Sequence, residues 1–209
     1  MITLKNISFG YNKKLILNNF NLTIPQGITT LLGKSGSGKT TVLRLIAGLE
    51  IPQKGEVQIN RETVSANGKI IVPPHKRNIG FIFQDLALWP DFTVKKHLEF
   101  VLKENKVGNV ARKVADTLGF FKLNGLENRY PSELSGGQKQ LLALARSIVL
   151  TPHILLMDEP LTGLDPDLKS MILDYLLKIK SELGTTIVYV THDRNEAEKI
   201  ADQIVQIGH

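Results

Sequence analysis

Residues 33–40 read Gly-Lys-Ser-Gly-Ser-Gly-Lys-Thr, and this run constrains the fold more than any other feature of the chain. It follows an apolar stretch, 29–32, and opens a predicted helix, the context in which the pattern G-x-x-x-x-G-K-[ST] binds phosphate. Glycines let successive backbone N–H groups turn inward into a nest for phosphate oxygens, and the helix N-terminus adds partial positive charge. With glycine at roughly 7% of residues, the four fixed positions match by chance in on the order of one chain in a hundred. The sequence therefore predicts a phosphate-binding loop.

Two side chains of this loop and two acids further along carry the expected chemistry. Lys39 can reach the β and γ phosphates of a nucleotide, and the Thr40 hydroxyl is placed to bind magnesium. The apolar run 154–157 ends in Asp158 and Glu159. A carboxylate at the end of a strand beside a phosphate loop can hold magnesium through Asp158, while Glu159 faces the attacking water. Kinases, GTPases and ATPases all remain open at this point.

Composition excludes several classes of protein. The chain has 209 residues, which corresponds to one large domain or a domain with an insertion. It has no cysteine, so disulfides and thiolate zinc sites are excluded. The most apolar run, 141–150, is interrupted by Arg146, and the first residues lack a signal peptide core, so we expect a cytoplasmic protein. The formal net charge of +6 favours anionic partners, although the Lys and Arg residues are scattered along the chain.

The pattern along the chain alternates between strands and helices. Short apolar stretches bounded by Gly and Asn predict strands over 2–9, 15–24, 29–32, 79–83, 154–157 and 185–191. Helical patterns cover 93–118, with a break at 108–109, and 166–183, which begins after Asp165 and ends at Gly184. This alternation is typical of an α/β fold.

Two further features complete the pattern. Asp193 and Glu196 are expected to form a capping pair for a last helix. Leu134-Ser135-Gly136-Gly137-Gln138 precedes a predicted helix over 139–150 and offers free N–H groups at a second helix N-terminus. The chain thus carries two candidate phosphate sites.

With these motifs in order, the sequence resembles the ATP-binding cassette (ABC) ATPases over nearly its whole length. In that family LSGGQ is the diagnostic signature, and it is intact at 134–138. Tyr11 matches the aromatic residue that stacks on adenine, and Gln84 matches the glutamine that links magnesium and water to the membrane partner. The segment 161–165 resembles the loop that ends in Asp165, and His192 matches the switch histidine.

The resemblance implies an α/β P-loop NTPase with a mostly parallel core sheet, an N-terminal antiparallel β subdomain and an inserted helical subdomain. We expect one domain over 1–209, with the core in 1–84 and 141–209 and the helical insertion with the signature in 85–140. The implied cofactors are ATP and Mg²⁺.

The resemblance also implies a site shared between two subunits that meet head to tail, in which ATP is part of the interface. The implied catalytic residues are Glu159, His192, Gln84 and Lys39. The implied magnesium ligands are Thr40, Gln84 and Asp158. The residues implied to contact the nucleotide are Tyr11, Gly33, Ser35, Gly36, Ser37, Gly38, Lys39, Thr40 and Thr41 from one subunit, with Ser135, Gly136, Gly137, Gln138 and Asp165 from the other.

The segments 73–84 and 87–90 look like those of importer cassettes for small solutes such as polyamines, sulfate, molybdate, iron or sugars. The apolar side chains of Leu86, Leu88, Trp89 and Phe92 are expected to meet a membrane permease, with ordinary core packing as the alternative. The implied location is the inner face of the membrane. Importer cassettes of this type commonly continue into a C-terminal regulatory domain, whereas this sequence ends at His209.

Two departures from the family pattern concern the subunit interface. The signature helix usually carries an arginine near its start where this chain has Leu141, which we expect to alter the interface charge. Thr162 and Gly163 replace the usual residues of the loop before Asp165.

Two other functions remain as alternatives. A soluble cassette ATPase acting on nucleic acid or the ribosome would suit the positive charge, but such proteins usually carry a long coiled-coil insertion or two cassettes in tandem. A phosphate-loop kinase or GTPase has no use for LSGGQ. We therefore expect a transport ATPase with a permease and a second copy of the chain as partners, and no nucleic acid.

Overall fold

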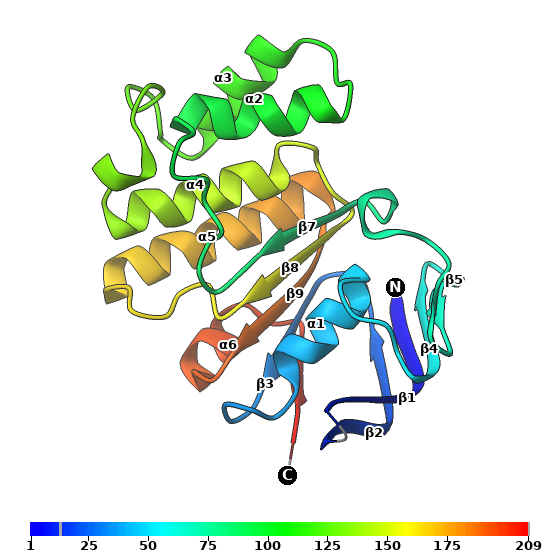
Figure 1. The fold of residues 1–209 in the computed structure, drawn as a ribbon. Coiled ribbons are helices and arrows are strands. Elements are labelled where there is room, and N and C mark those ends of the chain that lie inside the picture. Colours follow the sequence, from blue (N-terminus) through cyan, green and yellow to red (C-terminus); the bar gives the residue numbers. More distant parts are fainter. Residues whose placement is uncertain (13, 209) are drawn as a thin grey trace.

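The computed structural model describes residues 1–12 and 14–208, in which two sheets pack together with helices (Figure 1). Lys13 and His209 lie outside the described residues. The first sheet is antiparallel, with strands in the order β2-β1-β4-β5-β6. Its strands are β1 (Ile2–Tyr11), β2 (Lys14–Ile24), β4 (Lys54–Ile59), β5 (Glu62–Ala66) and β6 (Lys69–Ile70).

The second sheet is parallel throughout, with strands in the order β10-β3-β9-β8-β7. Its strands are β3 (Ile28–Leu32), β7 (Ile79–Ile82), β8 (Ile154–Asp158), β9 (Thr186–Thr191) and β10 (Gln203–Gln206). This confirms the expected fold class, an α/β chain with a parallel core sheet and an antiparallel N-terminal sheet.

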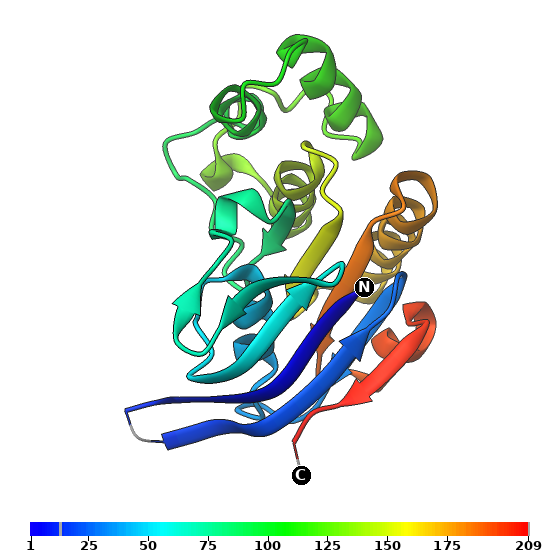
Figure 2. The same cartoon turned by 90° about the vertical axis from the view of Figure 1, so that its right-hand side faces the viewer.

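Helices connect the strands of the parallel sheet. They are α1 (Lys39–Ala47), α2 (Val94–Glu104), α3 (Val110–Phe120), α4 (Gly136–Ile148), α5 (Pro166–Leu183) and α6 (Arg194–Ile200), with short 3-10 turns η1 (Pro74–Lys76) and η2 (Pro131–Glu133). Both views place α2 and α3 at the opposite end of the molecule from the β1–β2 hairpin (Figures 1 and 2). No helix among the described residues is long and apolar enough to cross a bilayer.

Alternation along the buried strands separates two apolar cores. In β8, Leu156 packs with α1 and the antiparallel sheet, whereas Leu155 and Met157 face α4 and α5. Successive side chains of a strand point to opposite faces, so a wholly apolar strand must be covered on both sides. Figure 1 shows α1 on one side of the parallel sheet and α4 and α5 on the other.

Most of the expected elements are present, with shifted ends and some omissions. The break predicted at 108–109 separates α2 from α3, and Asp165 and Gly184 cap α5 as predicted. The strands β4, β5, β6 and β10 were not predicted, because their apolar residues are few and interspersed with polar ones.

The signature helix differs from the prediction at its start. The sequence predicts a helix from Lys139, but α4 begins at Gly136, because the Ser135 hydroxyl accepts from the Gln138 N–H and the Gln138 side chain returns to the Ser135 N–H. This reciprocal capping box stabilises a first turn that contains two glycines. The helix then runs unbroken past residue 140, where the sequence places a subdomain boundary.

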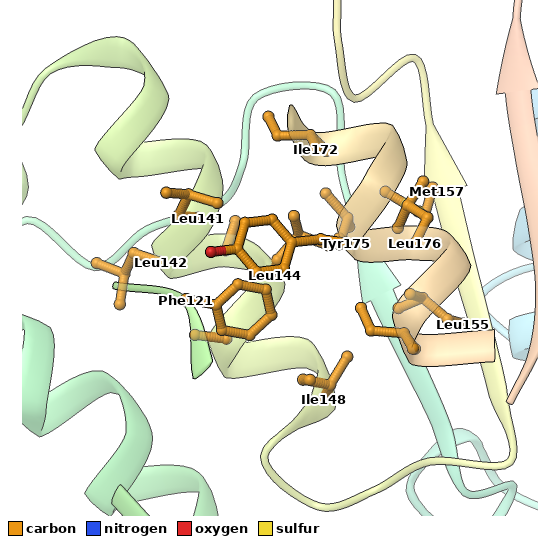
Figure 3. Packing of buried hydrophobic residues seen from close by; sticks show 14 of the residues in the cluster. Phe121, Leu141, Leu142, Leu144, Ile148, Leu155, Met157, Ile172, Tyr175 and Leu176 are labelled. Carbon is orange, nitrogen blue, oxygen red and sulfur yellow. The ribbon is translucent and has the colours of Figure 1, made fainter. Parts of the chain in front are cut away.

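Leu141 lies in the core and not on a charged surface. Its side chain is 7% exposed and packs in the cluster that contains Phe121, Tyr175 and Leu176 (Figure 3). In this chain the position contributes apolar packing between α4 and its neighbours, and the expected change of interface charge stays a prediction.

Arg77 joins the antiparallel sheet to the end of α1. Its guanidinium is 5% exposed and donates to the carbonyls of Leu45 and Ile46 at the end of α1, at 3.3 and 2.8 Å. It also donates to the Val64 carbonyl, to the Ser65 hydroxyl and to the Val72 carbonyl. Burial lowers the pKa of Arg77 to about 10, which leaves the side chain charged at neutral pH. Every donor direction of the guanidinium therefore has an oxygen acceptor.

We expect Arg77→Met to destabilise the fold strongly. Methionine fills similar space but leaves several buried carbonyls without a donor, at a cost of about 3 kcal/mol or more. In a domain of this size that loss lowers the thermal midpoint by roughly 6–12 °C. Scanning calorimetry measures it, with Arg112→Met, at an exposed position of α3, as the control. Equal midpoints for the two variants would contradict this account of Arg77.

Candidate functional site

The described residues form a hollow of about 520 Å³ at the carboxyl edge of the parallel sheet. It is lined by Ile16, Lys34, Ser35, Gly36, Gly38, Lys39, Thr40, Thr41, Gln84, Glu159 and His192. Apart from Ile16 of β2, the segments that follow β3, β7, β8 and β9 supply this lining. Open α/β sheets bind ligands at this edge, where the connecting loops diverge.

The phosphate loop has the backbone that its glycines permit. Gly36 and Gly38 have φ values of 79° and 97°, which other residues rarely adopt. Among the described residues, no side chain caps the start of α1, so its first N–H groups are available to a ligand. The Lys39 ammonium donates to the carbonyls of Gly33 and Lys34 at 2.7 and 2.8 Å, inside the loop. The arrangement suits a polyphosphate, whose oxygens replace these carbonyls as acceptors.

The C-terminal strand supports this loop from behind. A side chain at Gly33 would lie 2.3 Å from the Ile207 carbonyl, which follows β10. Ile207 in turn donates to the Leu32 carbonyl at 2.8 Å. The Ser37 hydroxyl, on the same loop, is buried and has no hydrogen-bond partner among the described residues. It is an unpaired polar group within the predicted phosphate nest.

Thr40 and Asp158 form the candidate metal site. The Thr40 hydroxyl donates to Asp158 Oδ1 at 3.0 Å, across 118 residues of sequence. Burial raises the pKa of the Asp158 carboxyl, and the hydrogen bond from Thr40 opposes this rise. No cluster of three or more His, Cys, Asp or Glu side chains suited to a metal occurs in residues 1–12 and 14–208. A buried carboxylate beside a hydroxyl is nevertheless the donor set that suits magnesium, which takes its other ligands from phosphates and water.

Glu159 and His192 meet at the open side of the hollow. Glu159 follows β8 with a φ of 46°, and its N–H donates to the Val190 carbonyl of β9 at 3.1 Å. This bond turns the carboxylate toward His192, whose Nδ1 lies 3.2 Å from Glu159 Oε2. The His192 side chain is 60% exposed, so this pair is accessible to solvent and to a ligand.

Gln84 lines the same hollow, but the signature residues do not. Ser135, Gly136, Gly137 and Gln138 form the start of α4, at the left edge of the molecule in Figure 1. Asp165 is likewise exposed outside the hollow, and its carboxylate accepts from the Leu168 N–H at 2.9 Å to cap α5. The described chain thus holds much of one predicted half-site in a hollow, and the exposed residues Ser135, Gly136 and Asp165 of the other half-site lie elsewhere.

Tyr11 also lies outside the residues that line the hollow. Its ring is 39% exposed and packs edge-on against Phe9, with centroids 5.0 Å apart. Its hydroxyl donates to Glu50 at 2.7 Å, and burial, aided by Glu50, raises its pKa. The stacking of Tyr11 on adenine stays a prediction.

The predictions miss one residue that lines the site and give another residue the wrong role. Ile16 of β2 lines the hollow and packs near Gly38, and its partly buried position in an apolar strand gave no sign of this role. The residue with the wrong role is Glu196, whose side chain is expected to cap α6 by accepting a hydrogen bond from the Asp193 N–H. The Asp193 carboxylate does cap the helix, but the Asp193 N–H donates to the Thr191 hydroxyl instead.

The Glu196 carboxylate instead forms a hydrogen-bond network with side chains of β9 and α5. It accepts from the Tyr189 hydroxyl at 2.7 Å, the Thr191 hydroxyl at 2.8 Å and the Lys169 ammonium at 2.8 Å. Desolvation raises the pKa of Tyr189 far above its ordinary value, so its hydroxyl remains a donor. The capping expectation for Glu196 is wrong because three donors compete successfully for its oxygens.

Comparison with known proteins agrees with this geometry. Residues 17–162 match the family described as ABC transporter. The chain is 42% identical over 211 residues to the sulfate/thiosulfate import ATP-binding protein CysA of Synechocystis sp., covering 100% of this chain and 58% of that protein. It is 40% identical over 207 residues to the Fe(3+) ions import ATP-binding protein FbpC 1 of Haemophilus influenzae, covering 98% and 62%. It therefore spans about three fifths of the length of these relatives.

A solved structure has the same fold. The dimeric post-hydrolysis state of the ATP-binding cassette MJ0796, bound to ADP and Pi, aligns with a TM-score of 0.86 and 31% identity, over 100% of this chain and 94% of that one. The family match covers more than half of the chain and includes both the phosphate loop and the signature. The chain belongs to the ABC transporter family.

Proposed function

We propose that the chain is the ATP-hydrolysing cassette of a membrane transporter and that it works as a head-to-tail pair. The observation that carries this proposal is the separation of the two half-sites. Lys39, Thr40 and Glu159 meet in one hollow, whereas Ser135 and Gly136 of the signature are exposed at the start of α4, outside that hollow. A second copy related by twofold symmetry would bring its Ser135 and Gly136 to the outer phosphate held by the first. The related MJ0796 cassette, described as dimeric with ADP and Pi, supports this arrangement.

Within one hollow, the residues have separate roles in hydrolysis. The Lys39 ammonium exchanges its two loop carbonyls for phosphate oxygens, which neutralises charge on the transferred group. Thr40, Asp158 and Gln84 would hold the magnesium, which supplies Lewis-acid polarisation of the phosphates when bound. Tyr11 and Ile16 would contact the base and sugar.

Glu159 is the proposed general base. Its carboxylate faces the hollow, and no other acidic side chain lines it. It would accept a proton from water that attacks the γ-phosphate, and His192 at 3.2 Å would hydrogen-bond the same phosphate. Loss of the γ-phosphate removes contacts made only in the closed dimer, so the equilibrium shifts toward the open form.

The transport step would use residues 85–140 as the unit that meets a permease. Trp89 is 37% exposed, and Phe92 and Phe100 pack against it, with ring centroids 5.2 and 5.3 Å away. An aromatic cluster that remains part-exposed beside the Gln84 loop is a suitable contact for an apolar helix of a membrane partner. This partner would place the chain at the inner face of the membrane.

Import is the proposed direction, because the related proteins are import subunits by name. Their solutes differ, so the solute is set by other subunits.

The competing function, in which a soluble cassette acts on nucleic acid, has only the net charge of +6 in its favour. Tight binding to duplex DNA at physiological salt would support it, and recovery of a multi-span permease from membranes would support transport.

We expect two inactive variants to restore activity when they are mixed. Lys39→Ala removes the phosphate contact of one half-site, and Ser135→Arg blocks the other with a bulky side chain. A mixed dimer of the two retains one intact shared site, so an equal mixture should recover about a quarter of the wild-type ATPase rate if subunits exchange freely. Phosphate release measures the rate. A mixture no more active than the separate variants would contradict a site shared between copies.

We expect Glu159→Gln to slow hydrolysis by at least ~100-fold, the scale of general-base catalysis. Glutamine keeps the shape but cannot accept the proton, so ATP still binds and holds the dimer together. Phosphate release gives the rate, and size-exclusion chromatography with MgATP gives the dimer. Glu104→Gln, at an exposed position at the end of α2, is the control. Near-normal turnover in Glu159→Gln would exclude this base.

We expect Asp158→Asn to stabilise the protein without ligands while it abolishes the effect of magnesium on ATP affinity. Burial raises the Asp158 pKa above its unfolded value, so the fold disfavours the charged form at neutral pH, and the neutral amide relieves that penalty. The amide oxygen can still accept from Thr40. Thermal melting and ATP titrations with and without magnesium measure both effects, with Asp91→Asn as the exposed control. A lower midpoint, or retained magnesium dependence, would contradict the assignment.

A further inference from the structure

The loop after Gln84 adopts an unusual backbone. Leu86 and Ala87 have φ values of 61° and 44°, so two consecutive residues with side chains are left-handed. Two local bonds support this shape, from the Leu86 N–H to the Phe83 carbonyl at 2.9 Å and from the Ala87 N–H to Asp85 at 3.2 Å. Neither position is glycine, so something outside the loop must stabilise the conformation.

Arg146, in the last turn of α4, supplies that support. Its guanidinium donates to the carbonyl of Ala87 and to the carbonyl of Leu86, the latter at 2.8 Å. These are the carbonyls of the two left-handed residues. The same guanidinium lies over the ring of Trp89, 5.0 Å from its centroid. One planar group thus contacts both strained residues and the first aromatic residue that follows them.

The helix that carries Arg146 also carries the signature. α4 extends from Gly136 to Ile148, and Ser135 caps its start. Next to Arg146, the Ser147 hydroxyl lies 2.8 Å from the Ala143 carbonyl of its own helix and 3.2 Å from the Phe81 carbonyl of β7. A helix transmits displacement along its axis because its backbone is internally bonded. The exposed signature and the Gln84 loop are therefore at two ends of one rigid element.

We propose that Arg146 is a positioning residue that couples Gln84 to Trp89 and to α4. It holds the loop 84–89 in its left-handed shape, so that movement of Gln84 on nucleotide binding is passed to the aromatic cluster and to the signature helix. The proposal rests on the proposed function, because it assumes that Gln84 faces bound nucleotide. The bond pattern requires the planar fork of arginine, since a lysine ammonium cannot meet both carbonyls and cover the ring together.

The single tryptophan of the chain makes the coupling measurable, because Trp89 is the only one and lies on the loop. The experiment compares Arg146→Met, Arg146→Lys and Ser147→Ala in an otherwise Glu159→Gln chain, which retains ATP. Tryptophan emission and its quenching by acrylamide are recorded with and without MgATP. Calorimetric titration of MgATP gives the affinity independently, and thermal melting gives the stability.

In the parent chain, we expect MgATP to change the emission and quenching of Trp89. In both Arg146 variants this response should be lost, and quenching without nucleotide should rise, although MgATP still binds. Ser147→Ala should lower the thermal midpoint but keep the response, because it removes a hydroxyl at the contact of α4 with β7 and leaves every bond of Arg146 in place. If the role of Arg146 were purely structural, Arg146→Met would lower the thermal midpoint and keep the response of Trp89 to MgATP. If only its charge mattered, Arg146→Lys would keep that response.

The results separate the two levels of the proposal. If MgATP binds but Trp89 responds equally in the parent chain and in Arg146→Met, or in neither of them, the coupling role of Arg146 is wrong and the proposed function stands. If no chain binds MgATP, the proposed function fails. If, in addition, acrylamide quenches Trp89 equally in Arg146→Met and in the parent chain without nucleotide, Arg146 does not hold the loop 84–89 in shape.

Discussion

The hydrogen bond between Thr40 and Asp158 depends on strands that end at the same level. β3 and β8 both pair with β9, where Leu32 lies opposite Thr191 and Asp158 lies opposite Val190. The residues that follow these pairs are Gly33, Glu159 and His192. A parallel sheet with this register therefore delivers the phosphate loop, the acid and the histidine to one edge. A slip of one residue in β8 would turn Asp158 to the other face and separate the site.

The central part of this site could be predicted because its signals are local. The phosphate loop has its own glycine pattern, and the acids follow a short apolar strand, so each piece needs only its immediate neighbours in sequence. Parallel strands then bring their carboxyl ends together by topology alone. The strands of the antiparallel sheet were harder to predict, because β4 to β6 alternate weakly and depend on partners far along the chain.

The hydrogen-bond partners of long polar side chains could not be predicted from the sequence. Glu196 stands at the position of a capping residue, yet Tyr189, Thr191 and Lys169 converge on its oxygens. A capping bond in solvent contributes little compared with a set of buried donors that would otherwise be unpaired. The left-handed pair Leu86 and Ala87 carries no glycine or asparagine signal, so only the tertiary bonds to Arg146 account for it.

Arg77 and Arg146 use the same physical device at two places. Neither guanidinium forms an ion pair within residues 1–12 and 14–208, and both donate to backbone carbonyls. Arg77 fixes the end of α1, the helix that follows the predicted phosphate loop, and Arg146 joins the end of α4 to the Gln84 loop. Carbonyl oxygens hold a guanidinium without the large desolvation cost of a buried carboxylate, and they leave its orientation fixed by several acceptors. In the proposed function, the antiparallel sheet would resist the force that a nucleotide exerts at the start of α1, while Arg146 would keep the Gln84 loop linked to the signature helix.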